Sequence, residues 1–437
     1  MSMTKRQQVK NRSLVFSLAF VGAVVTGFMS ASSAVAACQI VRPPGGDCMG
    51  GLFCGERVYD MSAVVDACGG DVADAVEAVL ADGGNILESR APKVLWFPPM
   101  RKYQIRRPLM IRAPGTELIG GDPRYPQLKT ALLCDIASVQ TEERRACIYF
   151  GKDDGDTFFQ WQNDTSYGAK LSNLEIYWTV KTHNLAPISG VEFERFRHVS
   201  VRDVSFFNFP QKSLFVRGVQ QSDFRRLIFR CPSSKYQSCS VALHVNNGDL
   251  PVDGRGHWNS TSNRLEEVSI EGFDYGIRYD GDATGVTLDA SDFSNNRVHS
   301  IEVKSIKQAR ITRSTFNSSQ AGGSEILFTR ALLPTSDGAT RSYSHPDLIL
   351  SQNRFQMNCR AERWPIMADY LPSNSNTPLA RLAFFGNDIR DLHTAQVIGN
   401  TATAPTFTTQ CGTGNTLQCC GVGPTSDFDV RCANGGN

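Results

Sequence analysis

Short alternations of apolar and polar residues recur along the middle of the chain at a regular spacing. The segments that carry them are 199–206, 222–229, 264–270, 287–293, 310–316 and 348–355. Phe206 and Phe229 are 23 residues apart, and the same spacing separates Ile270, Phe293 and Phe316. A period near 23 residues with several short strands per repeat is typical of a right-handed parallel β-helix, in which each coil pairs only with its neighbours. We therefore predict an all-β solenoid.

The phase of the repeat places a third strand in each coil, at 214–217, 241–246, 276–280, 300–304 and 325–329. Side chains alternate between the two faces of a strand. The apolar positions of these strands, such as Leu214, Ile277 and Ile326, are therefore expected to point inward. Two rows are expected to point outward: Phe215, His244, Arg278, Glu302 and Leu327, and beside them Arg217, Asn246, Asp280, Lys304 and Thr329.

Residues 71–82 have the period of an amphipathic helix, with Asp71 as its N-cap. We expect this helix to cover the N-terminal end of the solenoid, because an open end would expose strand edges. The domain boundaries that follow are a leader at 1–37, a cysteine-containing segment at 38–70, the β-helix at 71–400 and a cysteine-rich tail at 401–437.

The N-terminus has the pattern of a signal peptide. Lys5, Arg6, Lys10 and Arg12 precede an apolar run, which ends at the small-residue site Ala34-Val35-Ala36. No later run approaches the ~20 apolar residues that a membrane helix needs. We expect a protein that is secreted, periplasmic or on the cell surface. Removal of the leader changes the net charge from +2 to −2, which disfavours nucleic acid as a partner.

All 13 cysteines follow the leader, in a compartment that permits disulfides. Cys231 and Cys239 enclose a short loop and are the first predicted pair, with Cys134 and Cys147 as the second. Because the number of cysteines is odd, one of them is left without a partner in the chain. Cys38 follows Val35-Ala36-Ala37, which resembles a lipoprotein site, so the alternatives are a lipidated Cys38 and one free thiol.

The segments 71–80, 94–99, 103–105, 108–111 and 118–121 resemble the N-terminal stretch of the pectate-lyase-like superfamily. The coils extend the resemblance over roughly residues 60–400. The superfamily usually has a glycine where this chain has Met100. The resemblance implies an extracellular β-helix protein, either a polysaccharide lyase, hydrolase or epimerase or a non-catalytic adhesin. The polygalacturonase motifs are absent from the sequence.

The two outward rows are the candidate active site, because stacked coils bring His244, Arg278, Asp280, Glu302 and Lys304 together. A uronate lyase needs a cation for the substrate carboxylate, for which Arg278 or Arg217 is suited, and a base, for which Lys304 or His244 is suited. A hydrolase would instead use Asp280 and Glu302 as paired carboxylates. The alternative is an ordinary solvated face.

Other candidates lie outside these rows. His257 and Trp258, in an inserted loop, are candidates to stack on a sugar, with Asn246 and Arg217 as further binding residues; the alternative for Trp258 is a packing anchor. We expect no cofactor, although Asp153, Asp154 and Asp156 offer oxygen ligands for Ca²⁺; the other interpretation is a solvated acidic turn. The predicted function is cleavage of an acidic polysaccharide by a lyase or hydrolase, and the alternative is non-catalytic glycan binding or adhesion.

Overall fold

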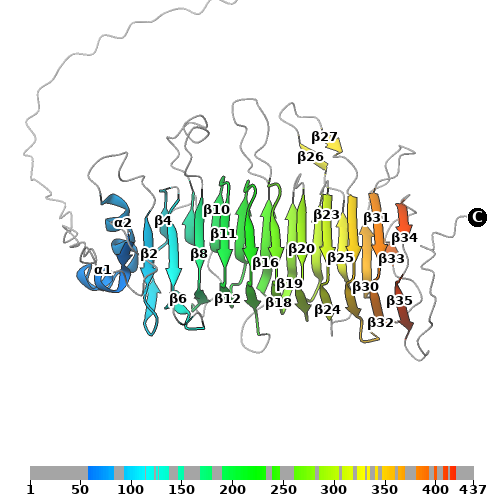
Figure 1. Cartoon of the computed structure of the whole chain (residues 1–437), viewed down its shortest axis with the longest axis horizontal. Coiled ribbons are helices and arrows are strands. Elements are labelled where there is room, and N and C mark those ends of the chain that lie inside the picture. Colours follow the sequence, from blue (N-terminus) through cyan, green and yellow to red (C-terminus); the bar gives the residue numbers. More distant parts are fainter. Residues whose placement is uncertain are drawn as a thin grey trace, which may run out of the picture. The chain divides into compact units, whose positions relative to one another are not determined.

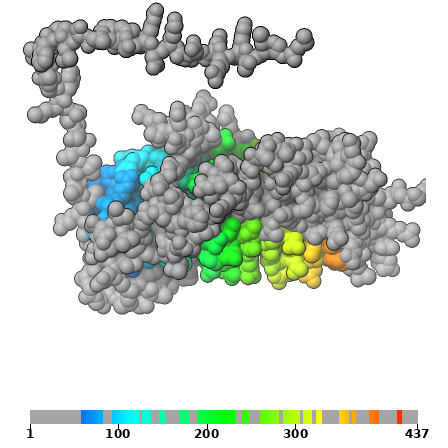
Figure 2. Space-filling view, turned by 90° about the horizontal axis from the view of Figure 1, so that it is seen from above, coloured from blue at the N-terminus to red at the C-terminus, as the bar shows by residue number. Residues whose placement is uncertain are grey.

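We describe the fold from a computed structural model of the chain. The residues that the structure describes are 58–82, 93–113, 115–122, 125, 127–136, 146–151, 168–179, 189–232, 239–246, 260–280, 285–304, 308–317, 322–329, 332–334, 340–342, 347–359, 363–369, 380–392, 398–400, 407–411 and 414–419. These residues form three long parallel sheets, which together make a right-handed parallel β-helix, as the sequence repeat predicts. The coils follow one another in chain order along the stack (Figure 1), and Figure 2 shows the same order from above.

The first sheet has twelve strands. Its strands are β1 (Val58–Asp60), β2 (Val94–Phe97), β5 (Glu117–Gly120), β8 (Ala169–Ser172), β11 (Val199–Arg202), β14 (Asp223–Arg225), β17 (Arg264–Glu266), β20 (Val286–Asp289), β23 (Gln308–Thr312), β28 (Asp347–Ser351), β31 (Ala380–Phe385) and β34 (Phe407–Cys411). The second sheet has eleven strands. They are β3 (Lys102–Ile105), β6 (Thr130–Cys134), β9 (Leu174–Trp178), β12 (Ser205–Phe207), β15 (Ile228–Arg230), β18 (Ser269–Glu271), β21 (Asp292–Ser294), β24 (Thr315–Asn317), β29 (Arg354–Gln356), β32 (Asp388–Leu392) and β35 (Thr416–Cys419).

The third sheet has ten strands. They are β4 (Leu109–Ile111), β7 (Ala146–Phe150), β10 (Ser189–Glu194), β13 (Lys212–Arg217), β16 (Cys239–Asn246), β19 (Phe273–Asp280), β22 (His299–Lys304), β25 (Ser324–Thr329), β30 (Trp364–Asp369) and β33 (Ile398–Asn400). A small antiparallel pair, β26 (Leu332–Pro334) and β27 (Thr340–Ser342), follows β25. The first and second sheets extend to β34 and β35, beyond the predicted end of the β-helix at residue 400.

The apolar residues that mark the sequence period pair with one another in the second sheet. Phe206 pairs with Phe229, which pairs with Ile270, and the series continues through Phe293 and Phe316. These rings are fully buried and stack along the helix axis, with centroids 4.9 Å apart for Phe206 and Phe229 and 5.0 Å for Phe293 and Phe316. The period in the sequence is therefore the number of residues between successive members of one stack of side chains in the core.

The turn between the first and second strands of each coil requires a left-handed backbone. The residues that adopt it include Asn173, Asp203, Arg226, Glu267, Ala290, Arg313 and Gln352, all with φ between 48° and 58°. One such residue lets the chain turn sharply without interrupting either strand. The polar pairs of the repeat are therefore the corners of the coil.

Two helices lie at the N-terminal end of the stack (Figure 1). Helix α1 (Met61–Ala67) precedes α2 (Val72–Ala81), and the side chain of Asp71 accepts hydrogen bonds at the start of α2, as predicted. The ammonium of Lys93 is buried and donates to the carbonyl oxygens of Val79, Leu80 and Asp82 at the C-terminal end of α2. This cation satisfies carbonyls that a helix end leaves free, and it joins the cap to the coil that begins with β2.

Within the described part of the chain, two disulfides join cysteines that are close in the sequence. Cys231–Cys239 and Cys134–Cys147 are both present, with Cα atoms 6.2 and 6.0 Å apart. These are the two pairs that the sequence spacing predicts. The leader at 1–37 and Cys38 lie outside the described residues.

Candidate functional site

The outer face of the third sheet carries the two rows that the sequence predicts. His244 pairs in register with Phe215 on one side and Arg278 on the other, and Arg278 pairs with Glu302. Beside them, Asn246 pairs with Asp280. The predicted inward residues Leu214, Ile277 and Ile326 are buried in the core. The phase inferred from the repeat is confirmed for these strands.

His244 is the centre of this face. Its Nε2 lies 2.7 Å from Oδ2 of Asp280, and its ring stacks on Phe215 with centroids 4.9 Å apart and planes 19° apart. Only 7% of the residue is exposed. Burial lowers the pKa of His244 although the bond to Asp280 opposes the shift. The imidazole is therefore neutral at pH 7, with Nε2 as the donor to Asp280.

The other ring nitrogen of His244 is not engaged in this way. Nδ1 is buried and has no hydrogen-bond partner among the described residues. In the tautomer that donates from Nε2, Nδ1 carries a lone pair and accepts protons. The site thus holds an oriented imidazole in which one nitrogen is bonded to a carboxylate and the other, though buried, carries an unshared electron pair.

Arg278 lies between two carboxylates of its own face. Its Nε is 2.9 Å from Oε2 of Glu302 and 3.4 Å from Oδ2 of Asp280. Those two oxygens are consequently no more than 6.3 Å apart, the sum of the two distances. The guanidinium also lies 5.3 Å from the ring centroid of Tyr275. His244, Asp280, Arg278 and Glu302 therefore form a continuous chain of polar contacts, and Arg278 already binds protein carboxylates.

Two glutamates on β10 continue the same face, and the sequence reasoning missed them. Glu192 and Glu194 are 6% and 8% exposed. Arg217 reaches both, at 3.4 Å from Glu192 and 3.9 Å from Glu194, and the hydroxyl of Tyr149 donates to Glu194. The alternation Val191-Glu192-Phe193-Glu194 is visible in the sequence, but this coil precedes the segments with the regular spacing.

Two further residues of this face were also missed. On β13, the ammonium of Lys212 lies 3.7 Å from the ring centroid of Phe215. On β22, His299 accepts a hydrogen bond from the backbone N–H of Ser324 at its Nδ1, and its ring lies 5.8 Å from that of Tyr275. Burial lowers the pKa of His299 to about 4. The face therefore carries a second neutral imidazole, whose Nε2 holds the proton.

Several predicted residues are not brought into this cluster by any described contact. Lys304 ends β22 and pairs in register with Thr329, but its side chain lies outside the described residues. His257, Trp258 and the acidic residues Asp153, Asp154 and Asp156 also lie outside them. No group of acidic, histidine or cysteine side chains suited to a metal ion occurs in the part of the chain that the structure describes.

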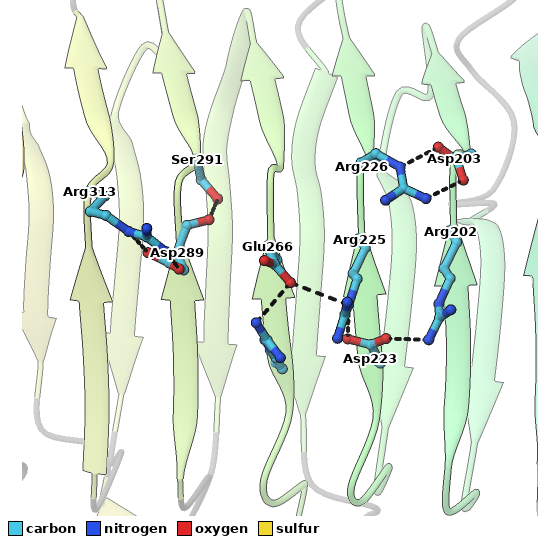
Figure 3. Close-up of polar contacts among 10 residues, drawn as sticks. Arg202, Asp203, Asp223, Arg225, Arg226, Glu266, Asp289, Ser291 and Arg313 are labelled. Atoms are coloured by element: carbon cyan, nitrogen blue, oxygen red, sulfur yellow. Dashed lines mark hydrogen bonds and ion pairs between the residues drawn. The ribbon is translucent and has the colours of Figure 1, made fainter. Parts of the chain in front are cut away.

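The first sheet also carries charges on its outer face, but their arrangement differs. Figure 3 shows Arg202 and Arg225 on either side of Asp223, with Arg225 also reaching Glu266. Arg226 binds Asp203 at the neighbouring corner, and Arg313 binds Asp289. The side chains of these arginines are 32–60% exposed, and each has an acidic partner. Such a ladder is ordinary surface electrostatics, whereas the third sheet holds buried charges and histidines.

Comparison with known proteins yields likeness in fold only. No protein-family model matches the chain, and no curated protein does. Among solved structures, ORF18 of Geobacillus virus E2 is 10% identical with a TM-score of 0.48; the match covers 80% of this chain and 58% of that one. The surface adhesin PfbA of Streptococcus pneumoniae is 10% identical over 82% of this chain and 92% of that one, with a TM-score of 0.42.

A third solved structure is the catalytic unit of a GH87 alpha-1,3-glucanase from Streptomyces thermodiastaticus. It is 14% identical over 82% of this chain and 69% of that one, with a TM-score of 0.43. The chain thus spans less than two thirds of the viral protein and most of the other two. Identities of 10–14% carry no information about activity.

Proposed function

We propose that this protein is an extracellular enzyme that cleaves an acidic polysaccharide by β-elimination, with His244 as the base. The observation that carries the proposal is the 2.7 Å contact between Nε2 of His244 and Asp280, which leaves Nδ1 as the accepting nitrogen. A buried, neutral, carboxylate-oriented imidazole is the arrangement that general-base catalysis needs.

In this reaction His244 takes the proton from the carbon next to the uronate carboxylate. The electron pair of that C–H bond forms a carbon–carbon double bond, and the glycosidic C–O bond breaks. The released oxygen takes up a proton from water. Asp280 stabilises the imidazolium that forms and keeps the ring in place, as a carboxylate does for histidine bases generally.

The arrangement favours elimination over hydrolysis by an inverting mechanism. An inverting hydrolase needs room for a water molecule between its two carboxylates. In this protein the guanidinium of Arg278 contacts both Asp280 and Glu302, so it occupies the space between them. Arg278 is for the same reason a positioning residue in this proposal and not the group that receives the substrate carboxylate.

An extracellular location is part of the proposal. The leader-like N-terminus and the disulfides Cys134–Cys147 and Cys231–Cys239 support an oxidising destination. Among the described residues, no helix is long and apolar enough to cross a membrane. A lipid on Cys38 remains the alternative to full release.

The second candidate function is glycan binding without catalysis, as in an adhesin. It is favoured by the series of contacts from His244 through Asp280 and Arg278 to Glu302, because ion pairs are also what a purely structural face contains. The two candidates differ in whether new chain ends appear when the protein meets its polysaccharide.

The test is incubation with galacturonan, alginate and glycosaminoglycans, followed by ultraviolet absorbance of unsaturated products and by assay of reducing ends. We expect absorbance with at least one polymer and its loss in His244→Ala. The matched control is His198→Asn, since His198 is exposed at a corner outside this face and asparagine tolerates its φ of 56°. Reducing ends without absorbance would replace the lyase by a hydrolase, and binding without either would support the adhesin.

A further inference from the structure

Lys212 differs from the arginines around it on the third sheet. Arg217 lies within ion-pair distance of Glu192, and Arg278 lies within that distance of Glu302. The ammonium of Lys212 has no carboxylate at such a distance among the described residues. Its ammonium instead lies 3.7 Å from the ring centroid of Phe215. Within the described part of the chain, Lys212 is therefore a cation of this face without a carboxylate at ion-pair distance.

The surroundings of Lys212 make this unpaired state unfavourable. The side chain is partly buried, and burial lowers the pKa of Lys212. Glu192 and Asp280 attract the ammonium from a distance, whereas Arg217 and Arg278 repel it. A cation–π contact compensates only part of the cost of removing an ammonium from water. A lysine that costs stability in the free protein is typical of a binding residue.

Phe215 links Lys212 to the proposed base. The ring of Phe215 contacts the ammonium of Lys212 and stacks on the imidazole of His244 at a centroid distance of 4.9 Å. The ammonium therefore lies no more than 8.6 Å from the centre of the imidazole, the sum of the two distances. A single sugar residue can reach both groups, so the charge of Lys212 acts on the same substrate unit as the base or on the next one.

We infer that Lys212 binds the anionic group of the substrate sugar, a carboxylate or a sulfate ester, and that it distinguishes charged glycans from neutral ones. The inference rests on the proposed function for the site but concerns binding, which is measurable without turnover. Lys212 gives a point charge without a planar fork, and so it accepts either anion. Lys212 takes the role that the sequence analysis gave to Arg278 or Arg217.

The experiment compares Lys212→Met, Lys212→Arg and the control Lys170→Met by calorimetric titration. Lys170 is a matched control because it lies on β8 of the first sheet and is paired with Glu117. The ligands are oligogalacturonate, oligoalginate, a sulfated glycosaminoglycan oligomer and the methyl ester of oligogalacturonate, which keeps the sugar and removes its charge.

We expect the wild type to bind at least one anionic oligomer and Lys212→Met to bind it at least tenfold more weakly. Lys212→Arg should retain most of the affinity, and Lys170→Met should bind like the wild type. If that oligomer is oligogalacturonate, the methyl ester should bind the wild type as weakly as the anion binds Lys212→Met. The ligand-free Tm of Lys212→Met should equal or exceed that of the wild type, which excludes unfolding as the cause.

The inference fails if Lys212→Met keeps wild-type affinity for every oligomer, or if the wild type binds none of the anionic ones. It also fails if the loss of affinity in Lys212→Met is accompanied by a ligand-free Tm below that of the wild type. Charge-dependent binding without any ultraviolet-absorbing product would sustain the anion subsite and reject the lyase. Elimination that continues unchanged in Lys212→Met, but stops in His244→Ala, would sustain the lyase and reject the subsite.

Discussion

His244 and Asp280 are 36 residues apart in the chain, yet Nε2 of His244 and Oδ2 of Asp280 are 2.7 Å apart. Their contact is diagonal across two neighbouring strands, because His244 is in register with Arg278, two positions before Asp280. Adjacent coils of a β-helix thus bring side chains from distant parts of the sequence into one hydrogen-bonded group. This pair makes specific predictions for the pH dependence of activity.

Asp280→Asn should lower the rate of elimination by tenfold or more, since the amide orients the imidazole less well than the carboxylate. The hydrogen bond to Asp280 raises the pKa of His244 against the larger effect of burial. Without the carboxylate the pKa falls further, so the acidic limb of the pH–rate profile should move to lower pH. The measurement is kcat/KM against pH for both proteins.

The wild-type profile gives a second check. A base is active when deprotonated, and burial lowers the pKa of His244 below the ordinary value of 6.5. The acidic limb should therefore lie below pH 6.5. A limb above that value, or one that Asp280→Asn leaves in place, would mean that another group is the base.

Most of the fold follows from the sequence because a solenoid is built from nearest-neighbour contacts. Once Phe206, Phe229 and Phe293 are aligned, the period fixes which strands pair, and alternation fixes which side chains point outward. Helix α1 escaped prediction because seven residues are too few to reveal a helical period.

The contacts within the candidate site could not be predicted in the same way. The register places Arg278 beside both His244 and Glu302, but only side-chain geometry shows that its guanidinium contacts two carboxylates. Similarly, the charge of Lys212 is evident in the sequence, whereas its lack of an acidic partner among the described residues depends on the directions that Glu192 and Arg217 take. Alternation determines the face of the sheet on which each side chain lies, and the rotamer of that side chain determines which neighbour it contacts.

His299 should make the stability of the protein depend on pH. Burial lowers its folded-state pKa to about 4, whereas the ordinary pKa of histidine, which applies in the unfolded chain, is 6.5. A depressed folded pKa contributes stability that is complete above pH 6.5 and is lost as pH falls toward 4. Lowering the pH from 7 to about 4.5 should therefore cost the wild type about 2–3 kcal/mol through this residue.

The measurement for His299 is urea unfolding of the wild type and His299→Gln at both pH values. The variant has no group that titrates at this position, so its loss of stability between the two pH values should be smaller by about the same 2–3 kcal/mol. Equal losses of stability in the two proteins would show that the pKa of His299 is the same in the folded and unfolded states.

Met100 holds a backbone conformation that suits glycine. Its φ is 71°, and its side chain is 92% exposed, so no packing compensates for the strain. Met100→Gly should raise the free energy of unfolding by about 0.5–1 kcal/mol, because glycine adopts this region without a Cβ clash. Met100→Ala keeps the Cβ and should show no such gain. Urea unfolding measures both, and an equal effect of the two substitutions would attribute the change to the exposed side chain.

Glu325 and Arg363 form an ion pair in which both side chains have zero exposure. Nε of Arg363 donates to Glu325 at 2.8 Å, and its other nitrogens donate to the carbonyl oxygens of Gly322 and Asn296 at 2.9 and 3.0 Å. The hydroxyl of Ser300, next to His299 on β22, also donates to Glu325. The pair therefore fixes the corner from which β22 and β25 enter the third sheet.

The losses of stability in the two single variants of this pair should add up to far more than the loss in the double variant. Glu325→Gln leaves a buried guanidinium without its counter-charge, and Arg363→Met leaves a buried carboxylate, so each should cost about 3–5 kcal/mol. The double variant has no unpaired charge and should be no less stable than the worse single one. Denaturant unfolding of the four proteins measures the coupling. Additive losses would contradict it and would mean that each group is stabilised by its backbone and hydroxyl hydrogen bonds, independently of the other charge.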